Sequence, residues 1–139
     1  MARASHVAEE TIRVLFIEDD PAVAEMYKLK LELDGYLVTV ISPRDDASRA
    51  GTDVRPELVF IDTQRDEDAG LATLRALRAA PQTRNVPVII LSNQHPRQLA
   101  ASGFQADILD YVVHADLSLS SLSRDIDQWA IAGQDGIPA

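Results

Sequence analysis

RVLFIEDDP, residues 13–21, is the segment from which the fold class of this chain is most easily inferred. Its four consecutive apolar residues, Val14 to Ile17, are typical of a strand that is buried on both faces of a parallel sheet. The acids that follow and Pro21 form a helix start signal, because acidic residues favour the cap and proline favours the first turn. A strand that leads directly into a helix predicts one β-then-α unit.

Four further apolar runs repeat this pattern, and the gaps between them have room for helices, which parallel strands need as crossovers. With right-handed crossovers, the pattern predicts a doubly wound α/β domain, a flavodoxin-like three-layer sandwich with a five-stranded parallel sheet in the order 2-1-3-4-5. The runs lie at residues 37–41, 58–61, 88–91 and 111–113. We expect helices over residues 21–35, 44–51 (short), 70–79 and 96–104, and a last one capped by Ser118 with the apolar stripe Leu119, Leu122, Ile126 and Trp129.

Composition narrows the class of protein. The 139 residues fit one domain, and the absence of cysteine excludes a disulfide framework, a thiolate metal site and a cysteine nucleophile. A net charge of −9 argues against nucleic acid or an anionic membrane as a partner of this domain. No apolar run approaches membrane-spanning length, so we expect a cytoplasmic protein. We expect a disordered extension over residues 1–11, the domain over 12–131 and a flexible tail over 132–139.

Polar side chains follow the predicted strands at the sheet edge where ligands bind in this kind of fold. The acids at 18–20 follow the first strand, Asp62 the third, Ser92 the fourth and His114 the fifth. Two carboxylates about 4 Å apart repel by roughly 4 kcal/mol at an effective dielectric near 20, so a counter-ion is expected. Hard oxygen ligands suit Mg²⁺ or Mn²⁺. Either Asp19 or Asp20 could instead serve only as a helix cap.

Four segments in order resemble the receiver domain of two-component response regulators, of the chemotaxis-regulator type. RVLFIEDDP resembles its opening, and PELVFID, which ends at Asp62, resembles its phosphoacceptor strand. Gly70 lies eight residues beyond Asp62, as in the family. VPVIILS, ending at Ser92, resembles the strand with the switch hydroxyl, and DYVV, residues 110–113, resembles the fifth strand. The resemblance extends over about residues 12–131.

The resemblance implies a phosphoprotein of a two-component phosphorelay. Asp62 would take a phosphoryl group from a sensor histidine kinase or a phosphotransfer protein. Ser92 and Tyr111 would then switch, and the fourth helix, fifth strand and fifth helix would relay the state to a downstream protein or a second copy. The resemblance also implies a set of ligands for Mg²⁺: Glu18, Asp19, Asp62 and the backbone carbonyl of Gln64.

The chain departs from the family pattern in its loops. His114 replaces the lysine that the family carries after the fifth strand, Asp66 stands where a proline is usual, and Ala69 replaces an acid. An alternative is therefore a degenerate receiver that acts as a phosphorylation-independent interaction module. We do not expect an enzyme, because a phosphatase of the aspartyl-phosphate type would want an acid at Gln64. Arg65 is either a loop charge or a contact for the donor phosphate.

Overall fold

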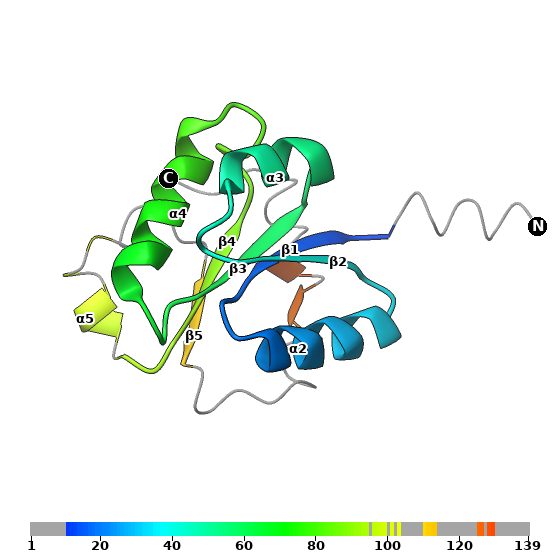
Figure 1. Ribbon diagram of the computed structural model, residues 1–139, viewed down its shortest axis with the longest axis horizontal. Helices are drawn as coiled ribbons and strands as arrows, with labels where there is room; N and C mark the ends of the chain where they lie inside the picture. The colour runs from blue at the N-terminus through cyan, green and yellow to red at the C-terminus, as the bar shows by residue number, and fades with distance from the viewer. Residues whose placement is uncertain are drawn as a thin grey trace, which may run out of the picture.

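Five strands form one parallel sheet at the centre of the protein (Figure 1). The computed structural model describes residues 11–94, 96–99, 101, 103, 110–113, 125, 126, 128 and 129. The sheet order β2-β1-β3-β4 confirms the prediction for the first four strands, and β5 pairs in parallel with β4. The strands are β1 (Arg13–Ile17), β2 (Leu37–Ile41), β3 (Leu58–Asp62), β4 (Val88–Ser92) and β5 (Asp110–Val113).

The strand register brings the C-terminal ends of β1 and β3 together. Ile17, the last residue of β1, lies opposite Ile41 of β2 on one side and Ile61 of β3 on the other. Every residue of β3 and β4 is buried. Continuous apolar runs therefore became central strands, as expected when both faces of a sheet are covered.

Helices cover both faces of this sheet, with α2 (Pro21–Leu33) on one side and α3 (Ala47–Val54) and α4 (Glu67–Ala79) on the other (Figure 1). Residues that alternate along each strand separate into two apolar cores. The core on the α2 side contains Val14, Phe16, Tyr27, Leu31, Val38, Leu58, Phe60, Ile89, Leu91, Ile126 and Trp129. The opposite core contains Leu15, Ile17, Ala47, Val59, Ile61, Leu74, Leu77, Val88, Ile90 and Leu99, the last from the short helix α5 (Pro96–Leu99).

Four aromatic side chains pack against one another in the core on the α2 side of the sheet. Phe16 stacks on Tyr27 with 4.8 Å between the ring centroids and on Phe60 with 5.4 Å. Trp129 packs edge-on against Phe60 at 5.9 Å and is 9% exposed, so this residue of the predicted apolar stripe does face the core. Such offset and edge-to-face pairs stabilise the fold beyond the apolar area that they bury.

Capping residues fix where the helices begin. Asp20 is the N-cap of α2, and its carboxylate accepts hydrogen bonds from the backbone N–H groups of Ala22 and Val23. Gly35, the last residue of the helix predicted over 21–35, lies two residues after α2 ends and has a φ of 99°. This backbone conformation is one that glycine adopts without steric cost.

Two other helices begin at residues that the sequence prediction missed. The helix predicted over 44–51 lies at Ala47–Val54, because the Asp46 side chain accepts a hydrogen bond from the N–H of Arg49 and caps it. The helix predicted from residue 70 begins at Glu67, because Asp66 caps it in the same way. Both boundaries were therefore wrong by three residues at the start.

Several predictions lie outside the described residues. They concern residues 1–10, His114, the cap at Ser118, the stripe residues Leu119 and Leu122, and the tail 132–139; the helix predicted over 96–104 is described over Pro96–Leu99 and at residues 101 and 103. Tyr111 is described as part of the backbone of β5. Within the described part of the chain, no helix is both long and apolar enough to cross a membrane.

Candidate functional site

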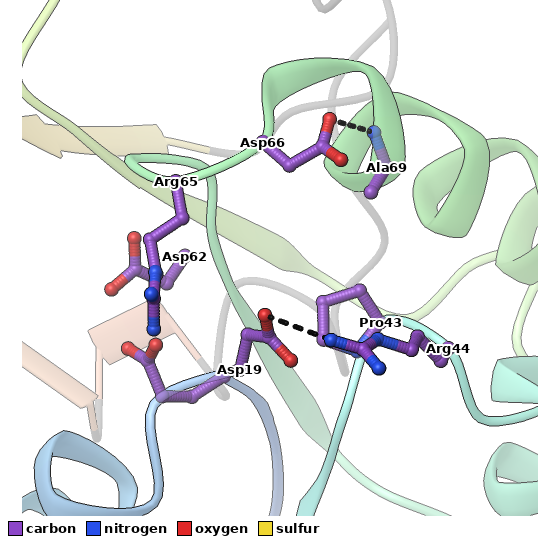
Figure 2. A pocket seen from close by; sticks show the side chains of 8 residues that line it. Asp19, Pro43, Arg44, Asp62, Arg65, Asp66 and Ala69 are labelled. Carbon is purple, nitrogen blue, oxygen red and sulfur yellow. Dashed lines mark hydrogen bonds and ion pairs between the residues drawn. The ribbon is translucent and has the colours of Figure 1, made fainter.

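A cavity of about 140 Å³ opens at the C-terminal edge of the sheet. It lies where the chain leaves β1 and β3, the switch point at which doubly wound sheets bind ligands. Three loops contribute to it: the one after β1, the one after β2, and the one between β3 and α4. The lining residues are Glu18, Asp19, Pro43, Arg44, Asp62, Arg65, Asp66 and Ala69 (Figure 2).

Glu18 is the most deeply buried acid of the cavity, at 5% exposure. Its Oε2 accepts a hydrogen bond from the backbone N–H of Asp20 at 3.1 Å, whereas its Oε1 is buried without a hydrogen-bond partner among the described residues. Burial raises the pKa of Glu18 to about 8, and the adjacent Asp62 carboxyl raises it as well. Burial and the neighbouring carboxyl group therefore both favour the protonated form of Glu18 near neutral pH.

Asp62 ends β3 and is oriented by the turn that follows it. Its Oδ1 accepts a hydrogen bond from the backbone N–H of Gln64 at 2.9 Å, and Gln64 Nε2 lies 3.5 Å from its Oδ2. The Gln64 amide oxygen in turn accepts a hydrogen bond from Asn93, which follows β4. Asp62 is 9% exposed, so one carboxylate edge is fixed while the group still borders the cavity.

Asp19 and Asp20 have different roles although they are adjacent. Asp20 caps α2, and its Oδ2 lies 3.9 Å from the Arg65 guanidinium. Asp19 lines the cavity, accepts a hydrogen bond from the Ser42 hydroxyl at 3.3 Å and lies 3.8 Å from the Arg44 guanidinium (Figure 2). The cap alternative therefore holds for Asp20 and is wrong for Asp19.

The cavity suits a hydrated Mg²⁺ better than a bare one. Among the described residues, no three acidic or histidine side chains form a ready-made metal cage. The donors nevertheless fit, because all are oxygens and Glu18 Oε1 is a buried acceptor without a partner. Mg²⁺ usually binds through one or two carboxylates and keeps several waters. Binding would require Glu18 to lose its proton and Asp19 to leave Arg44.

Ser92, at the end of β4, is 3% exposed, and its hydroxyl accepts a hydrogen bond from the backbone N–H of Gln94 at 2.9 Å. Thr63, which directly follows β3 and was not among the predicted site residues, is buried, and its hydroxyl donates a hydrogen bond to the carbonyl of Leu91 at 3.0 Å. Thr63 also explains Gly70, since a Cβ at residue 70 would lie 2.7 Å from Thr63 Cγ2. A β-branched residue directly after the strand was the only signal for Thr63.

Asp66 and Arg65, between β3 and the first turn of α4, both border the cavity. Asp66 replaces the usual proline as a helix cap, and its Oδ1 accepts a hydrogen bond from Ala69 N at 3.0 Å (Figure 2). Arg65 lines the cavity, and its guanidinium lies 3.9 Å from Asp20 Oδ2; a contact to the donor phosphate stays a prediction. Arg44 was missed entirely, because a loop sequence does not reveal which of its residues face a cavity.

Comparison with known proteins identifies the family of this chain. The response regulator receiver domain family matches residues 14–116, most of the chain. The DNA-binding response regulator MtrA of Mycolicibacterium smegmatis is 31% identical over 101 residues, covering 73% of this chain and 43% of that protein. The DNA-binding dual master transcriptional regulator RpaA of Synechocystis sp. is 27% identical over 72% of this chain and 42% of its own length. The chain thus spans less than half the length of these relatives.

Solved structures share the fold. The receiver domain of sensor histidine kinase PA1611 from Pseudomonas aeruginosa, with a magnesium ion in its active site cleft, matches with a TM-score of 0.72 and 24% identity, covering 86% of this chain and 98% of that one. Chemotaxis protein CheY4 of Vibrio cholerae matches with a TM-score of 0.74 and 18% identity over 85% and 98% of the two chains. With the family match and the cavity of acids at the switch point, this chain belongs to the response regulator receiver domain family.

Proposed function

We propose that this chain is a cytoplasmic, phospho-accepting signalling domain in which Asp62 takes a phosphoryl group from a sensor histidine kinase or a phosphotransfer protein. The observation that carries the proposal is the position of Asp62 at a cavity that it shares with Glu18 and Asp19. One oxygen of Asp62 is held by the backbone N–H of Gln64 at 2.9 Å, which orients the carboxylate. The other carboxylate oxygen, Oδ2, lies 3.5 Å from the Gln64 side-chain amide at the same cavity, and we propose it as the nucleophile.

In the proposed reaction, an Asp62 oxygen forms a bond to phosphorus while the P–N bond of the donor phosphohistidine breaks. The leaving imidazole nitrogen takes up a proton, and Asp62 becomes an acyl phosphate. Glu18, Asp19, Asp62 and the backbone carbonyl of Gln64 would hold Mg²⁺ or Mn²⁺, which when bound offsets the negative charge of the phosphoryl group. The magnesium ion described for the PA1611 receiver domain supports this choice of cation.

We further propose that the phosphorylated state is read through Ser92 and Tyr111, on β4 and β5. Ser92 is buried at the end of β4, at the edge that carries Asp62, and lies opposite Val113 of β5. Its hydroxyl could leave the Gln94 N–H for a phosphoryl oxygen, which is a small change that could bias a two-state surface. The output surface would be formed by the helix that begins with α5 (Pro96–Leu99), by β5 and by the last predicted helix. It would bind a downstream protein or a second copy of this chain. The net charge of −9 argues against nucleic acid as a partner of this domain.

A second candidate is a receiver that works only as an interaction module, without phosphorylation. The pairing of Asp19 with Arg44 favours it, because a metal ligand is engaged by a cation of the protein itself. The ion pair itself is weak, since the Arg44 side chain is 85% exposed and exposed ion pairs contribute about 0–1 kcal/mol. We propose a signalling domain rather than an enzyme in either case.

One experiment separates these functions. The protein is incubated with acetyl phosphate, with and without Mg²⁺, and its intact mass is measured. We expect one added phosphoryl group that requires Mg²⁺ and is absent from Asp62→Asn. Modification of Asp62→Asn to the same extent would move the acceptor elsewhere, and no modification of the native protein would favour the interaction module.

A further inference from the structure

Two arginines border the Asp62 cavity from different loops. Arg44 follows β2, and Arg65 lies between β3 and α4. Figure 2 shows the Arg44 side chain pointing toward Asp19, whereas the Arg65 guanidinium lies 3.9 Å from Asp20 Oδ2. On the basis of the proposed function, we infer that Arg44 and Arg65 form a clamp that binds the phosphoryl oxygens of the phosphodonor, whether an acyl phosphate or a phosphoramidate. Metal binding at Asp19 releases Arg44 for this role.

Both arginines are held only loosely by their acidic partners. The Arg44–Asp19 and Arg65–Asp20 pairs measure 3.8 and 3.9 Å between nitrogen and oxygen, longer than a charge-assisted hydrogen bond. Their side chains are 85% and 63% exposed. A guanidinium group on such a contact can turn to another anion at little cost, because surface ion pairs are weak.

Arg44 and Arg65 offset part of the negative charge of the acids that line the cavity. Its lining contains four acids and two arginines, a formal charge of −2 when all are ionised. A divalent cation brings the cavity to neutrality only because the arginines are present; without them the metal-bound cavity would still repel a phosphate. Guanidinium presents a planar fork of N–H donors that matches two phosphoryl oxygens, so arginine is well suited to this role.

Asp19 couples the clamp to the metal. Its carboxylate is within reach of Arg44 and is also a proposed ligand of Mg²⁺, and it cannot satisfy both cations equally. Arg44 therefore competes with the metal before the donor arrives and assists the donor afterwards. Removing Arg44 should have opposite effects on the two ligands, a signature that a merely structural role would not produce.

The test compares Arg44→Ala, Arg65→Ala and the double variant with Arg84→Ala. Arg84 is an exposed arginine in the loop between α4 and β4, at the opposite end of the sheet, so its loss changes the net charge equally. Three quantities are measured: the Mg²⁺ dissociation constant without donor, the affinity for beryllium fluoride at saturating Mg²⁺, and the rate of phosphorylation by acetyl phosphate. Thermal unfolding checks that each variant is folded.

We expect Arg44→Ala to bind Mg²⁺ more tightly than Arg84→Ala and to bind beryllium fluoride about tenfold more weakly, the loss typical of one charge-assisted hydrogen bond. Arg65→Ala should weaken beryllium fluoride binding similarly, and both variants should be phosphorylated more slowly. Arg44→Lys should recover part of the anion affinity, because it keeps the charge and loses the fork.

The failure of the clamp can be distinguished from the failure of the proposed function. If the native protein binds beryllium fluoride and is phosphorylated, but the arginine variants match Arg84→Ala, the clamp is wrong and the phosphoacceptor site stands. If the native protein does neither in the presence of Mg²⁺, the proposed function fails and the clamp with it.

Discussion

The Glu18 carboxyl lies beside that of Asp62, with one of its oxygens buried and without a hydrogen-bond partner among the described residues. The pair joins the ends of β1 and β3, the two strands that border the cavity. A buried acid of this kind costs stability when it ionises without a counter-ion. A bound cation would offset this cost, and so would a proton retained on Glu18.

The first prediction follows from the pKa of Glu18, which burial raises from 4.5 to about 8. Below about pH 4.5 the group is protonated in both the folded and unfolded states, and between these two values only the folded state retains the proton. The free energy of unfolding of the metal-free protein should therefore fall as pH rises from about 5 to 8, by on the order of a few kcal/mol. Urea unfolding at several pH values measures this.

Glu18→Gln is the matched control, because glutamine resembles the protonated acid and does not titrate. Its stability should depend less on pH across the same range, and the difference between the two profiles removes the contribution of the histidines. Saturating Mg²⁺ should flatten the native profile as well, since the cation replaces the proton. Equal slopes for the native protein and Glu18→Gln would contradict the assignment.

The second prediction concerns metal binding at Asp19. Mg²⁺ that binds only the folded state should raise the free energy of unfolding by about 1.4 kcal/mol at a concentration ten times its dissociation constant. Asp19→Asn should lose most of this stabilisation because a ligand is removed. The measurement is the midpoint of thermal unfolding as Mg²⁺ is added.

Asp20→Asn gives the control for this experiment. It removes the same charge one residue away, and asparagine caps a helix as well as aspartate does. Asp20 caps α2 and does not line the cavity. Its variant should therefore keep most of the metal response, and a loss as large as that of Asp19→Asn would mean that general charge, rather than ligation, governs the response.

The third prediction tests the cap that replaces a family proline. Asp66 accepts a hydrogen bond from Ala69 N at 3.0 Å at the start of α4. Asp66→Ala should lower the free energy of unfolding by about 1 kcal/mol, whereas Asp66→Asn should keep most of it. Urea unfolding of the three proteins measures both. If Asp66→Asn were as unstable as Asp66→Ala, the charge near the cavity rather than the cap would be the stabilising feature.

The strands could be predicted from the sequence more reliably than the helix caps, for physical reasons. The strands and the order of β2, β1, β3 and β4 follow from apolar runs, because burial on both faces leaves a strong sequence signal. The cap at Asp20 was recognisable because Pro21 follows it. Asp46 and Asp66 were not recognised, since each stands among other acids and only the backbone geometry shows which one accepts the first-turn N–H.

The acids of the site were predictable and its cations were not. Glu18, Asp19 and Asp62 follow strands whose ends must meet at one sheet edge, so their convergence at the cavity could be inferred. Arg44 lies in a loop after β2 whose path depends on local hydrogen bonds, such as the one from Ser42 N to the Asp45 side chain. The hydrophobic periodicity of a sequence does not predict the path of such a loop.

The last prediction concerns the contact between Gly70 and Thr63. A Cβ at residue 70 would lie 2.7 Å from Thr63 Cγ2, closer than two carbon atoms can approach without a shift. Gly70→Ala should therefore destabilise the protein, because overpacking of about 1–3 kcal/mol exceeds the roughly 1 kcal/mol that alanine contributes inside a helix. Thr63→Ser removes the obstructing methyl group and keeps the hydroxyl that donates to Leu91 O. In that background Gly70→Ala should become neutral or stabilising. A double-mutant cycle by urea unfolding measures this change of sign. Equal destabilisation in both backgrounds would show that Gly70 is required for a reason other than the methyl group of Thr63.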